Sequence, residues 1–354
     1  MTSGPEEGKA MPQVDAPAVY DLDPGELQEI EELLDDIAHD TFTAGAADPG
    51  GEAFYREGKE LTTRLPAGLR RFLYTFRTEE PAAAALIRGL PVDDAAIGPT
   101  PAHWRAAAAS PAGRREEAYL ALVGLALGEP FTWSTLQQGR MIQNVLPIAG
   151  EEAEQNGHGQ VTLEWHTEDG FHPYRCDHLL LMGMRNHDAI GTTLASVRDV
   201  RLSAEDRAIL AEKRFHILPD DEHLRQSAAL DPHHPGLARM RRMRDEPEPV
   251  AVLFGAQDSP YLRIDPVYMR CLPGDTAAEP ALKNLTGELD RAQQTVAVHP
   301  GEILLIDNYR AVHGRQSFTA RYDGTDRWLK KITVTADLRR SRDQRAHAAS
   351  RVIL

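Results

Sequence analysis

From Phe131 to the C-terminus, short runs of apolar and β-branched residues alternate with Gly, Pro and Asp. Runs of this length, bounded by residues that break regular structure, are typical of strands in a β-sandwich or barrel. The chain contains 27 Gly and 24 Pro, which also favours a loop-rich architecture over a helical bundle. We therefore expect residues 129–354 to form a two-sheet or barrel-like β core with inserted loops, built from MIQNVLPI, TLEWH, DHLLLMGMRN, TTLASV, PVAVLFG, YLRID, TVAVH, GEILLID and RWLKKITVT.

The first third of the chain instead shows helical periodicity. After Asp23, a candidate N-cap, the segment GELQEIEELLDDIAHDTF carries apolar residues at helical spacing. The same spacing extends over residues 68–77 and 115–128. Residues 19–128 are therefore expected to form a mainly helical layer against the β core.

Other segments complete the expected organisation of the chain. Residues 1–18, rich in Pro, Gly and charge, are interpreted as a flexible tail. Two further helices are expected inside the β region, at Ser203–Lys213 and about Ala277–Ala292, and the basic stretch 237–249 is interpreted as a self-neutralising surface loop or lid. The expected fold class is mainly β with flanking helices, in one domain over residues 19–354.

The charge balance and the cysteines limit the partners and the compartment. With 39 Lys and Arg against 54 Asp and Glu, the formal net charge is −15, which disfavours nucleic acid and anionic membranes and leaves small molecules as the expected partners. No apolar run is long enough for a signal peptide or a membrane span. Cys176 and Cys271 are too few for a disulfide framework and are interpreted as buried apolar residues rather than nucleophiles. We therefore expect a cytoplasmic protein; the sequence does not predict its oligomeric state.

The segment LEWHTEDGFHPYR at 163–175 holds a candidate metal site. His166 and Glu168 lie two residues apart in a segment of extended character, and residues i and i+2 of a strand point to the same face. An imidazole and a carboxylate side by side can chelate a metal ion. A chain with 14 His is nevertheless expected to contain about two His-x-acid matches by chance, so a surface pair without function is the alternative. A third ligand has to come from elsewhere.

The segment 301–334 offers that third ligand. It is interpreted as a strand, a turn containing His313, a loop rich in Gly and Asp, and a second strand carrying Arg327. The two residues are 14 positions apart, which is compatible with their facing each other across a hairpin.

Two His and one Glu make the 2-His-1-carboxylate facial triad, which leaves coordination positions open on Fe(II) for a 2-oxo acid and dioxygen. The second carboxylate of 2-oxoglutarate would then pair with the guanidinium group of Arg327, aided by the hydroxyl of Thr192 or Thr193. The residue pattern therefore predicts a site for Fe(II) and 2-oxoglutarate.

The order of motifs along the chain resembles that of a known family. The resemblance runs from VDDAAIGPTPAHW, at about Asp93, to DLRRSR near the C-terminus, and so covers most of the chain. The motifs are similar to those of the clavaminate synthase-like Fe(II)/2-oxoglutarate oxygenases, and most similar within that family to the arginine hydroxylases of the viomycin and capreomycin pathways. The matching segments are WHTEDGFHPYR, DHLLLMGMRN, GTTLAS, PVAVLFG, YLRID, IDNYRAVHGR and RYDGTDRWLKK.

The resemblance implies a double-stranded β-helix, or jelly-roll, core with a helical N-terminal layer. It implies that His166, Glu168 and His313 bind the iron and that Arg327, aided by Thr192, binds the distal carboxylate of 2-oxoglutarate. Family members convert 2-oxoglutarate and O2 to CO2 and succinate and hydroxylate an unactivated carbon, usually β or γ, of an amino acid. The expected substrate is a free polar or basic α-amino acid of specialised metabolism, which Glu168 is also expected to contact.

The expected substrate shell departs from that family in three places. Leu136 stands where the arginine hydroxylases have the first Gln of a Gln-rich motif, and Gln137 follows it. Asp265 is kept, but Val267 replaces the second acid that grips the guanidinium group. Lys331 replaces the Arg that holds the substrate carboxylate. Because one carboxylate does not reproduce a paired grip on a planar guanidinium group, a lysine-like, citrulline-like or modified arginine substrate is expected in preference to arginine.

Alternatives to hydroxylation of a free amino acid stay open. The same site could desaturate or cyclise its substrate, or act on an amino acid held by a carrier protein. A non-catalytic jelly-roll protein could instead keep the metal for structure or ligand sensing, although a structural site usually has four protein ligands.

Three features near these motifs have two interpretations each. Asp169 either supports Glu168 or is a solvated turn acid, with no preference between the two. His172 is interpreted as loop packing rather than a ligand. His233 and His234 are interpreted as part of a mobile, solvated loop rather than a metal site.

Overall fold

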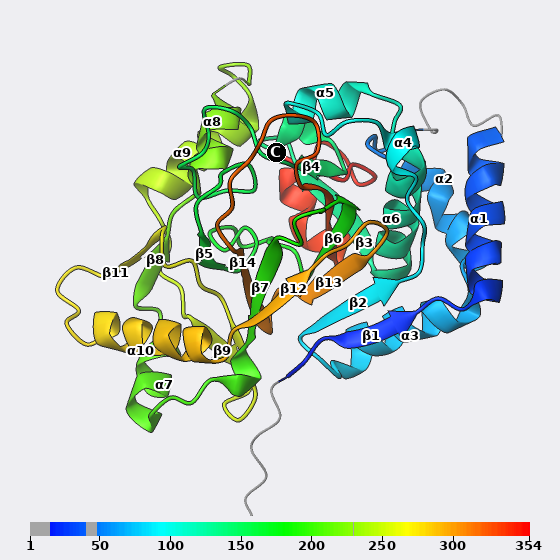
Figure 1. Cartoon of the computed structure of the whole chain (residues 1–354). Helices are drawn as coiled ribbons and strands as arrows, with labels where there is room; N and C mark the ends of the chain where they lie inside the picture. Colours follow the sequence, from blue (N-terminus) through cyan, green and yellow to red (C-terminus); the bar gives the residue numbers. More distant parts are fainter. Residues whose placement is uncertain (1–14, 40–47, 229) are drawn as a thin grey trace, which may run out of the picture.

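A computed structural model describes residues 15–39, 48–228 and 230–354, and two β-sheets surrounded by helices form its centre (Figure 1). The larger sheet has eight strands. In spatial order they are β1 (Ala18–Asp21), β2 (Ala84–Arg88), β13 (Ile303–Asp307), β6 (His178–Arg185), β15 (Trp328–Thr335), β3 (Glu129–Trp133) and β16 (Val352–Ile353), with β4 (Gln143–Val145) paired to β15. The predicted β core with flanking helices is therefore confirmed.

The smaller sheet carries part of the candidate site. Its four strands are, in spatial order, β12 (Gln294–Ala297), β7 (Gly191–Ser196), β14 (Ala311–Arg315) and β5 (Leu163–His166). Two short antiparallel pairs lie outside both sheets: β9 (Leu253–Gly255) with β10 (Pro260–Leu262), and β8 (Phe215–Ile217) with β11 (Met269–Cys271).

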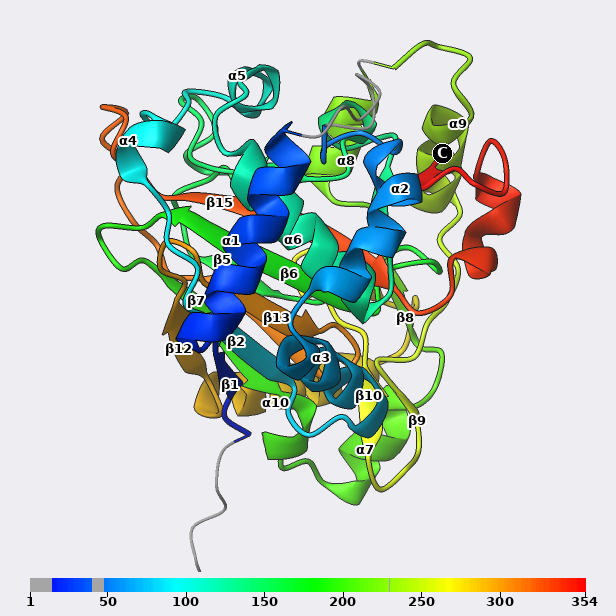
Figure 2. The ribbon, with the colours of Figure 1, turned by 90° about the vertical axis from the view of Figure 1, so that its right-hand side faces the viewer.

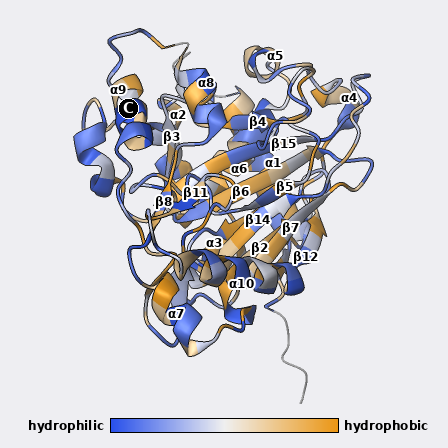
Figure 3. Ribbon diagram, turned by 90° about the vertical axis from the view of Figure 1, so that its left-hand side faces the viewer, coloured by the Kyte–Doolittle hydropathy of each residue, from blue (hydrophilic) through white to orange (hydrophobic). Residues whose placement is uncertain are grey.

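Side-chain alternation divides the core into layers. In β6, Leu180 and Met182 pack with the N-terminal helices, whereas Leu179 and Leu181 belong to the cluster between the two sheets. Successive residues of a strand point to opposite faces, so both faces of this strand are buried. Burial on both faces explains why such strands are continuous apolar runs in the sequence and do not alternate apolar with polar residues. It also explains why apolar residues gather on the central strands in Figure 3.

Helices cover the outer face of each sheet. The larger sheet packs against α1 (Pro24–His39), α2 (Phe54–Leu61), α3 (Ala67–Glu79) and α6 (Arg114–Leu127) (Figure 2). The smaller sheet packs against α7 (Ala204–Leu210) and α10 (Ala278–Arg291). Asp23 caps α1 as predicted, since its Oδ1 accepts the N–H groups of Gly25 and Glu26 at 2.8 and 2.9 Å. The other α-helices among the described residues are α4 (Asp94–Ile97), α5 (Trp104–Ala109), α8 (Asp221–Ser227) and α9 (Pro235–Asp245).

The N-terminal region is less helical than expected. β1 and β2 fall inside the expected helical layer and join the edge of the larger sheet, where β2 pairs with β13. The expected tail, residues 1–18, reaches too far, because the N–H of Asp15 donates to Asp199 at 3.0 Å and its carboxylate accepts from Ser196 Oγ at 2.8 Å. Residues 1–14 lie outside the described residues, as do residues 40–42 of the first expected helix.

The basic stretch 237–249 is not a loop. Most of it forms α9, which begins at Pro235, a residue favoured in the first helical turn because it lacks an N–H group. His234 caps this helix by accepting the Gly236 N–H at 3.1 Å, so only His233 fits the expected solvated loop. In the part of the chain that the structure describes, no helix is long and apolar enough to cross a membrane.

Candidate metal and substrate site

Strand pairing brings the two predicted histidine ligands together. β5 and β14 are antiparallel neighbours, and His166 lies directly opposite His313 with 4.2 Å between the ring centroids. His313 is also opposite Leu194, which packs between the sheets, so both imidazoles face the larger sheet. The predicted turn and hairpin are wrong: His313 belongs to β14 of the smaller sheet, whereas Arg327 immediately precedes β15 of the larger one.

Glu168 lies beyond the end of β5, so the expected extended segment stops at His166. Its backbone is held by Asn308, a fully buried residue between β13 and β14. The Glu168 N–H donates to Asn308 Oδ1 at 2.7 Å, and Asn308 Nδ2 donates to the Glu168 carbonyl at 3.0 Å. Asn308 was not among the predicted residues. The only signal was a polar residue directly after the apolar run ILLID.

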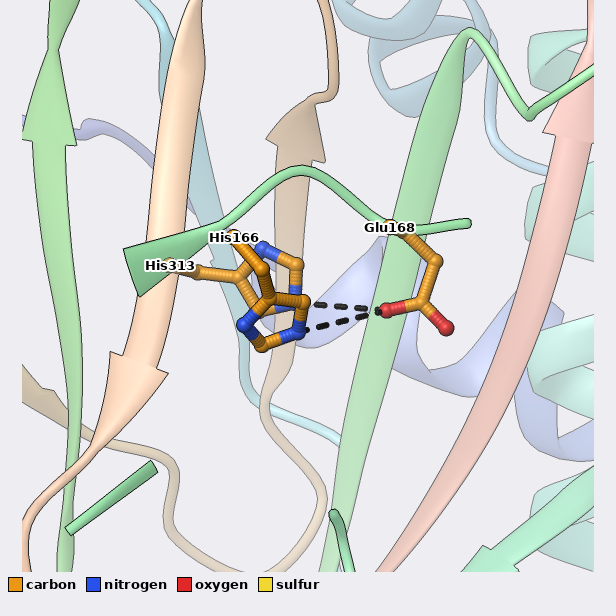
Figure 4. Close-up of side chains that lie close together, drawn as sticks. All are labelled: His166, Glu168 and His313. Carbon is orange, nitrogen blue, oxygen red and sulfur yellow. Dashed lines mark ion pairs between the residues drawn. The ribbon is translucent and has the colours of Figure 1, made fainter. Parts of the chain in front are cut away.

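The donor atoms of His166, Glu168 and His313 converge on one point (Figure 4). Oε2 of Glu168 is 3.3 Å from Nε2 of His313 and 3.9 Å from Nε2 of His166. Adjacent ligands of an octahedral ion with bonds of about 2.1 Å lie about 3 Å apart. Nδ1 of His166 is 3.0 Å from the Glu164 carbonyl, which can only accept, so Nδ1 carries the hydrogen and Nε2 keeps its lone pair. The three residues therefore fit a divalent ion such as Fe(II).

The charges around these donors favour a cation. Burial, and then repulsion by His313, lowers the pKa of His166 to about 4, so this imidazole is neutral at pH 7. Burial raises the pKa of Glu168, but Lys331 and the two histidines outweigh burial and hold that pKa well below its ordinary value. Two imidazoles, of which that of His166 is neutral, and one carboxylate therefore face the same point.

One cavity of about 960 Å³, including its open mouth, contains the three residues and most of the predicted substrate shell. Besides the three candidate ligands, its lining includes Leu136, Thr192, Asp220, Glu222, Asp265, Val267, Arg315, Arg327 and Lys331. Gln137 is an exception: it is not part of the lining, and its side chain is bonded to the backbone N–H and carbonyl of Asn144, both at 2.9 Å.

Two buried arginines give one end of this cavity its positive charge. Arg327 Nη2 donates to Thr192 Oγ1 at 3.3 Å. Within the described residues, neither Arg327 nor Arg315 is paired with a carboxylate, and the Nε of each is buried without a hydrogen-bond partner. Burial, and then repulsion by Arg315, lowers the pKa of Arg327 to about 9. Arg327, which has no carboxylate partner among the described residues, fits one carboxylate of the dianion 2-oxoglutarate. The terminal nitrogens of Arg315 already donate to the backbone carbonyls of Asn156 and Val161 at 3.3 and 2.7 Å, so Arg315 adds positive charge beside it. Arg315 was missed, although it lies two residues after His313 in a strand and so shares its face.

Carboxyl groups line another part of the cavity. Burial, and then repulsion by Asp220, raises the pKa of Asp265 to about 8. Burial also raises the pKa of Asp220 to about 6. Asp220 directly precedes α8, which supplies Glu222, 3.3 Å from His158 Nε2. Neither Asp220 nor Glu222 was predicted, because no spacing relates the run LPDDEH to the metal motifs.

Asp169 is buried and supports the loop that carries Glu168. Its two carboxylate oxygens lie 2.6 Å from Trp133 Nε1, which donates, and 3.1 Å from His223 Nε2. Its backbone has a φ of 51°, a left-handed conformation that such contacts have to maintain. The interpretation as a solvated turn acid is therefore wrong. His172 packs against Trp133 with 4.3 Å between ring centroids, which agrees with its interpretation as a packing residue.

The raised pKa of Asp265 predicts a pH-dependent stability. An unfolded Asp has a pKa of about 3.9, so the folded protein holds this proton more tightly and loses stability as the pH rises from about 4 to about 8. We expect the free energy of unfolding to fall with rising pH by roughly 1–3 kcal/mol less in Asp265→Asn than in wild type. The full pKa shift would give a larger difference, but Asp265 is only partly buried. Urea unfolding at pH 5 and pH 8 measures it, with the exposed Asp258→Asn as the control. An equal pH response in wild type and Asp265→Asn would contradict the assignment.

Comparisons with known proteins agree with this geometry. Residues 112–333 match the family described as taurine catabolism dioxygenase TauD, TfdA family. The chain is 43% identical over 309 residues to an enduracididine beta-hydroxylase of Streptomyces hygroscopicus, covering 85% of this chain and 90% of that protein. It is 40% identical over 298 residues to an L-ornithine/L-arginine 3-hydroxylase of Catenulispora acidiphila, covering 82% and 87%.

A solved structure extends the likeness to the fold. The non-heme iron oxygenase OrfP, in complex with Fe, succinate and (3S)-hydroxy-L-Arg, matches with a TM-score of 0.87 and 40% sequence identity, over 95% of this chain and 99% of that one. The chain belongs to the TauD/TfdA family of dioxygenases. The predicted relation to the Fe(II)/2-oxoglutarate oxygenases and the predicted class of enzyme are thereby confirmed.

Proposed function

We propose that this chain is an Fe(II)- and 2-oxoglutarate-dependent hydroxylase that acts on the β carbon of a free α-amino acid with a cationic side chain. The observation that carries this proposal is that one cavity holds the His166, Glu168 and His313 group together with Arg327, Arg315 and the carboxyl groups of Asp220 and Asp265. The names of the two relatives support the position, since one is a beta-hydroxylase and the other a 3-hydroxylase. Both names place the new hydroxyl group on the same carbon.

Each end of the cavity has a role in this proposal. His166, Glu168 and His313 would hold the iron, and Arg327 with Thr192 would bind the distal carboxylate of 2-oxoglutarate. With iron bound, the reaction consumes O2 and 2-oxoglutarate, releases CO2 and succinate, and places one oxygen atom in a C–H bond. The protein's part is to hold that carbon beside the metal and to exclude competing reactions.

The carboxyl groups favour a cationic side chain over a neutral one. The arginine hydroxylases have a second acid where this chain has Val267, so Asp265 has no acidic partner in its own segment. Asp220 supplies another carboxyl group to the same cavity from a different segment. Leu136 and Val267 add apolar surface beside them. A cation with an apolar edge, such as a cyclic guanidine, suits this combination better than the open guanidinium group of arginine, and a citrulline-like neutral group suits it less.

The proposal includes three statements about the whole chain. The two sheets form a double-stranded β-helix, since strands from distant parts of the sequence interleave in both. Residues 19–354 act as one oxygenase domain. The reaction takes place in the cytoplasm, where the two free thiols, Cys176 and Cys271, stay reduced.

The decisive experiment measures succinate release with Fe(II), 2-oxoglutarate and O2 while single amino acids are supplied. We expect stimulation by ornithine-like, lysine-like or cyclic guanidine amino acids, with a product heavier by one oxygen atom. A product lighter by two hydrogen atoms would indicate desaturation or cyclisation instead. Turnover only with an amino acid loaded on a carrier protein would contradict the free substrate.

A change of the acids tests the cationic substrate. We expect Asp265→Asn and Asp220→Asn each to raise the KM for the basic amino acid about 10- to 100-fold, because a hydrogen bond to a charged group contributes about 1.5–3 kcal/mol. The KM for 2-oxoglutarate should stay unchanged, which serves as the internal control. An equal rise in KM for a neutral and a cationic amino acid would mean that these carboxyl groups do not distinguish a charged side chain from a neutral one.

The remaining alternative is a non-catalytic metal-binding protein. Anaerobic addition of 2-oxoglutarate to the Fe(II) protein separates the two, because a bound 2-oxo acid gives a visible charge-transfer band. We expect the band. A colourless mixture together with bound iron would favour the non-catalytic alternative.

A further inference from the structure

Two neighbouring lysines of β15 face opposite sides of the larger sheet. Lys330 points toward the helical layer, where its Nζ donates to Glu117 at 2.7 Å. Lys331 points into the cavity, where its Nζ donates to Oε1 of Glu168 at 2.6 Å. Alternation along the strand therefore places only Lys331 beside the candidate metal site.

The two oxygens of Glu168 have different partners. Oε2 faces both histidines, at 3.3 and 3.9 Å, whereas Oε1 receives the hydrogen bond from Lys331. Among the described residues, Lys331 is the one side chain that donates to Oε1. The carboxylate is largely buried, with 8% of the residue exposed, so water can replace Lys331 only in part. Without this cation, the carboxylate could turn about its terminal bond and present either oxygen to an ion.

We propose that Lys331 is a positioning residue of the metal site, which holds the outer oxygen of Glu168 so that Oε2 alone is presented to the ion. This inference rests on the proposed function for the identity of the site. It differs from the role expected of this position, which was to bind the substrate carboxylate. An ammonium group has three N–H donors, so the bond to Glu168 leaves others free for a substrate.

The test measures metal binding without 2-oxoglutarate or an amino acid. Metal-free protein is titrated with Co(II), and its affinity and visible absorption spectrum are recorded for wild type, Lys331→Met, Lys331→Arg and Lys283→Met. We expect Lys331→Met to weaken Co(II) binding about 10- to 100-fold, the usual effect of losing a residue that orients a ligand. The spectrum should change as well, because the coordination by Glu168 changes. Lys331→Arg, which keeps the charge and the donors, should restore part of the affinity.

The control and the contrary outcome are equally direct. Lys283 is exposed on α10, so Lys283→Met removes one positive charge without touching the site and should leave Co(II) affinity unchanged. Wild-type or tighter Co(II) binding by folded Lys331→Met would overturn the proposal and leave Lys331 with a role toward substrate alone. If Lys331→Met does not fold, Lys331→Gln, which keeps an uncharged N–H donor group, is expected to give an intermediate affinity, and wild-type affinity there would overturn the proposal too. Wild-type protein that binds Co(II) but releases no succinate would contradict the proposed function, not the role of Lys331.

Discussion

His313→Ala should reduce amino-acid-dependent succinate release by more than about 100-fold. Residues that only orient a ligand typically cost 10- to 100-fold when they are changed, and the loss of a ligand should exceed that range. The loss should be as large for His166→Ala, because the two imidazoles are cross-strand partners that face the same point. Succinate assays over a range of Fe(II) concentrations measure the effect, since added iron should not restore the rate.

His233→Ala is the matched control for this loss of an imidazole. His233 is exposed and lies before α9, outside the cavity. Its change should leave both turnover and thermal stability at wild-type values. Turnover within about tenfold of wild type in folded His313→Ala would show that the metal assignment is wrong.

Arg327→Gln should raise the KM for 2-oxoglutarate by roughly 100-fold, because a carboxylate left without its charged partner in a buried site costs about 2–5 kcal/mol. Arg327 is almost fully buried and, within the described residues, has Thr192 as its one hydrogen-bond partner. Its guanidinium group therefore stays free for a carboxylate. Steady-state kinetics with 2-oxoglutarate varied, at saturating amino acid, measure this change.

Two companion variants define the contact at the Arg327 end. Arg327→Lys keeps the charge but loses the planar fork, so it should lie between wild type and Arg327→Gln. Thr192→Val should raise the same KM by about tenfold, because it removes one hydrogen bond between a neutral hydroxyl group and a charged group. A KM for 2-oxoglutarate that is unchanged in Arg327→Gln, with a raised KM for the amino acid, would place the cosubstrate elsewhere.

Residue types, local spacing and the resemblance of ordered motifs predicted many of the elements and the three candidate metal ligands. The helices at α1, α3 and α10 have one-sided apolar periodicity, and α6 is an apolar helix that is buried on almost every side. Most strands from β4 to β15 appear as short apolar runs between breakers, whereas β8, β11 and β14 were not predicted as strands. The choice of His166, Glu168 and His313 depended on residue chemistry and on the resemblance of ordered motifs. The geometry around them was not predictable in the same way, because strand pairing across 147 residues of sequence, from His166 to His313, has no local signal.

The residues that sequence reasoning missed share a physical cause. Asn308 acts through its side-chain amide on a backbone 140 positions away, and Asp220 reaches the cavity only because α8 packs over it. The short strands β1 and β2 lie between helical segments of the chain and were not predicted. Their pairing with each other, which defines them as strands, joins residues far apart in the sequence. The basic stretch 237–249 was assigned from its charge pattern, whereas the helix is set by Pro235 and the His234 cap.

The chemical groups of the cavity come from separate parts of the fold. The three candidate metal ligands lie on or directly beside the paired strands β5 and β14, whereas Asp220 and Glu222 belong to α8 and its preceding turn, and Asp265 to the loop after β10. Replacing the segments around residues 218–228 and 263–268 with those of a relative would therefore exchange the groups proposed to contact the substrate, while the strands that carry the candidate metal ligands stay in register. This division makes the chain a suitable scaffold for engineering hydroxylases of new amino acids by segment exchange.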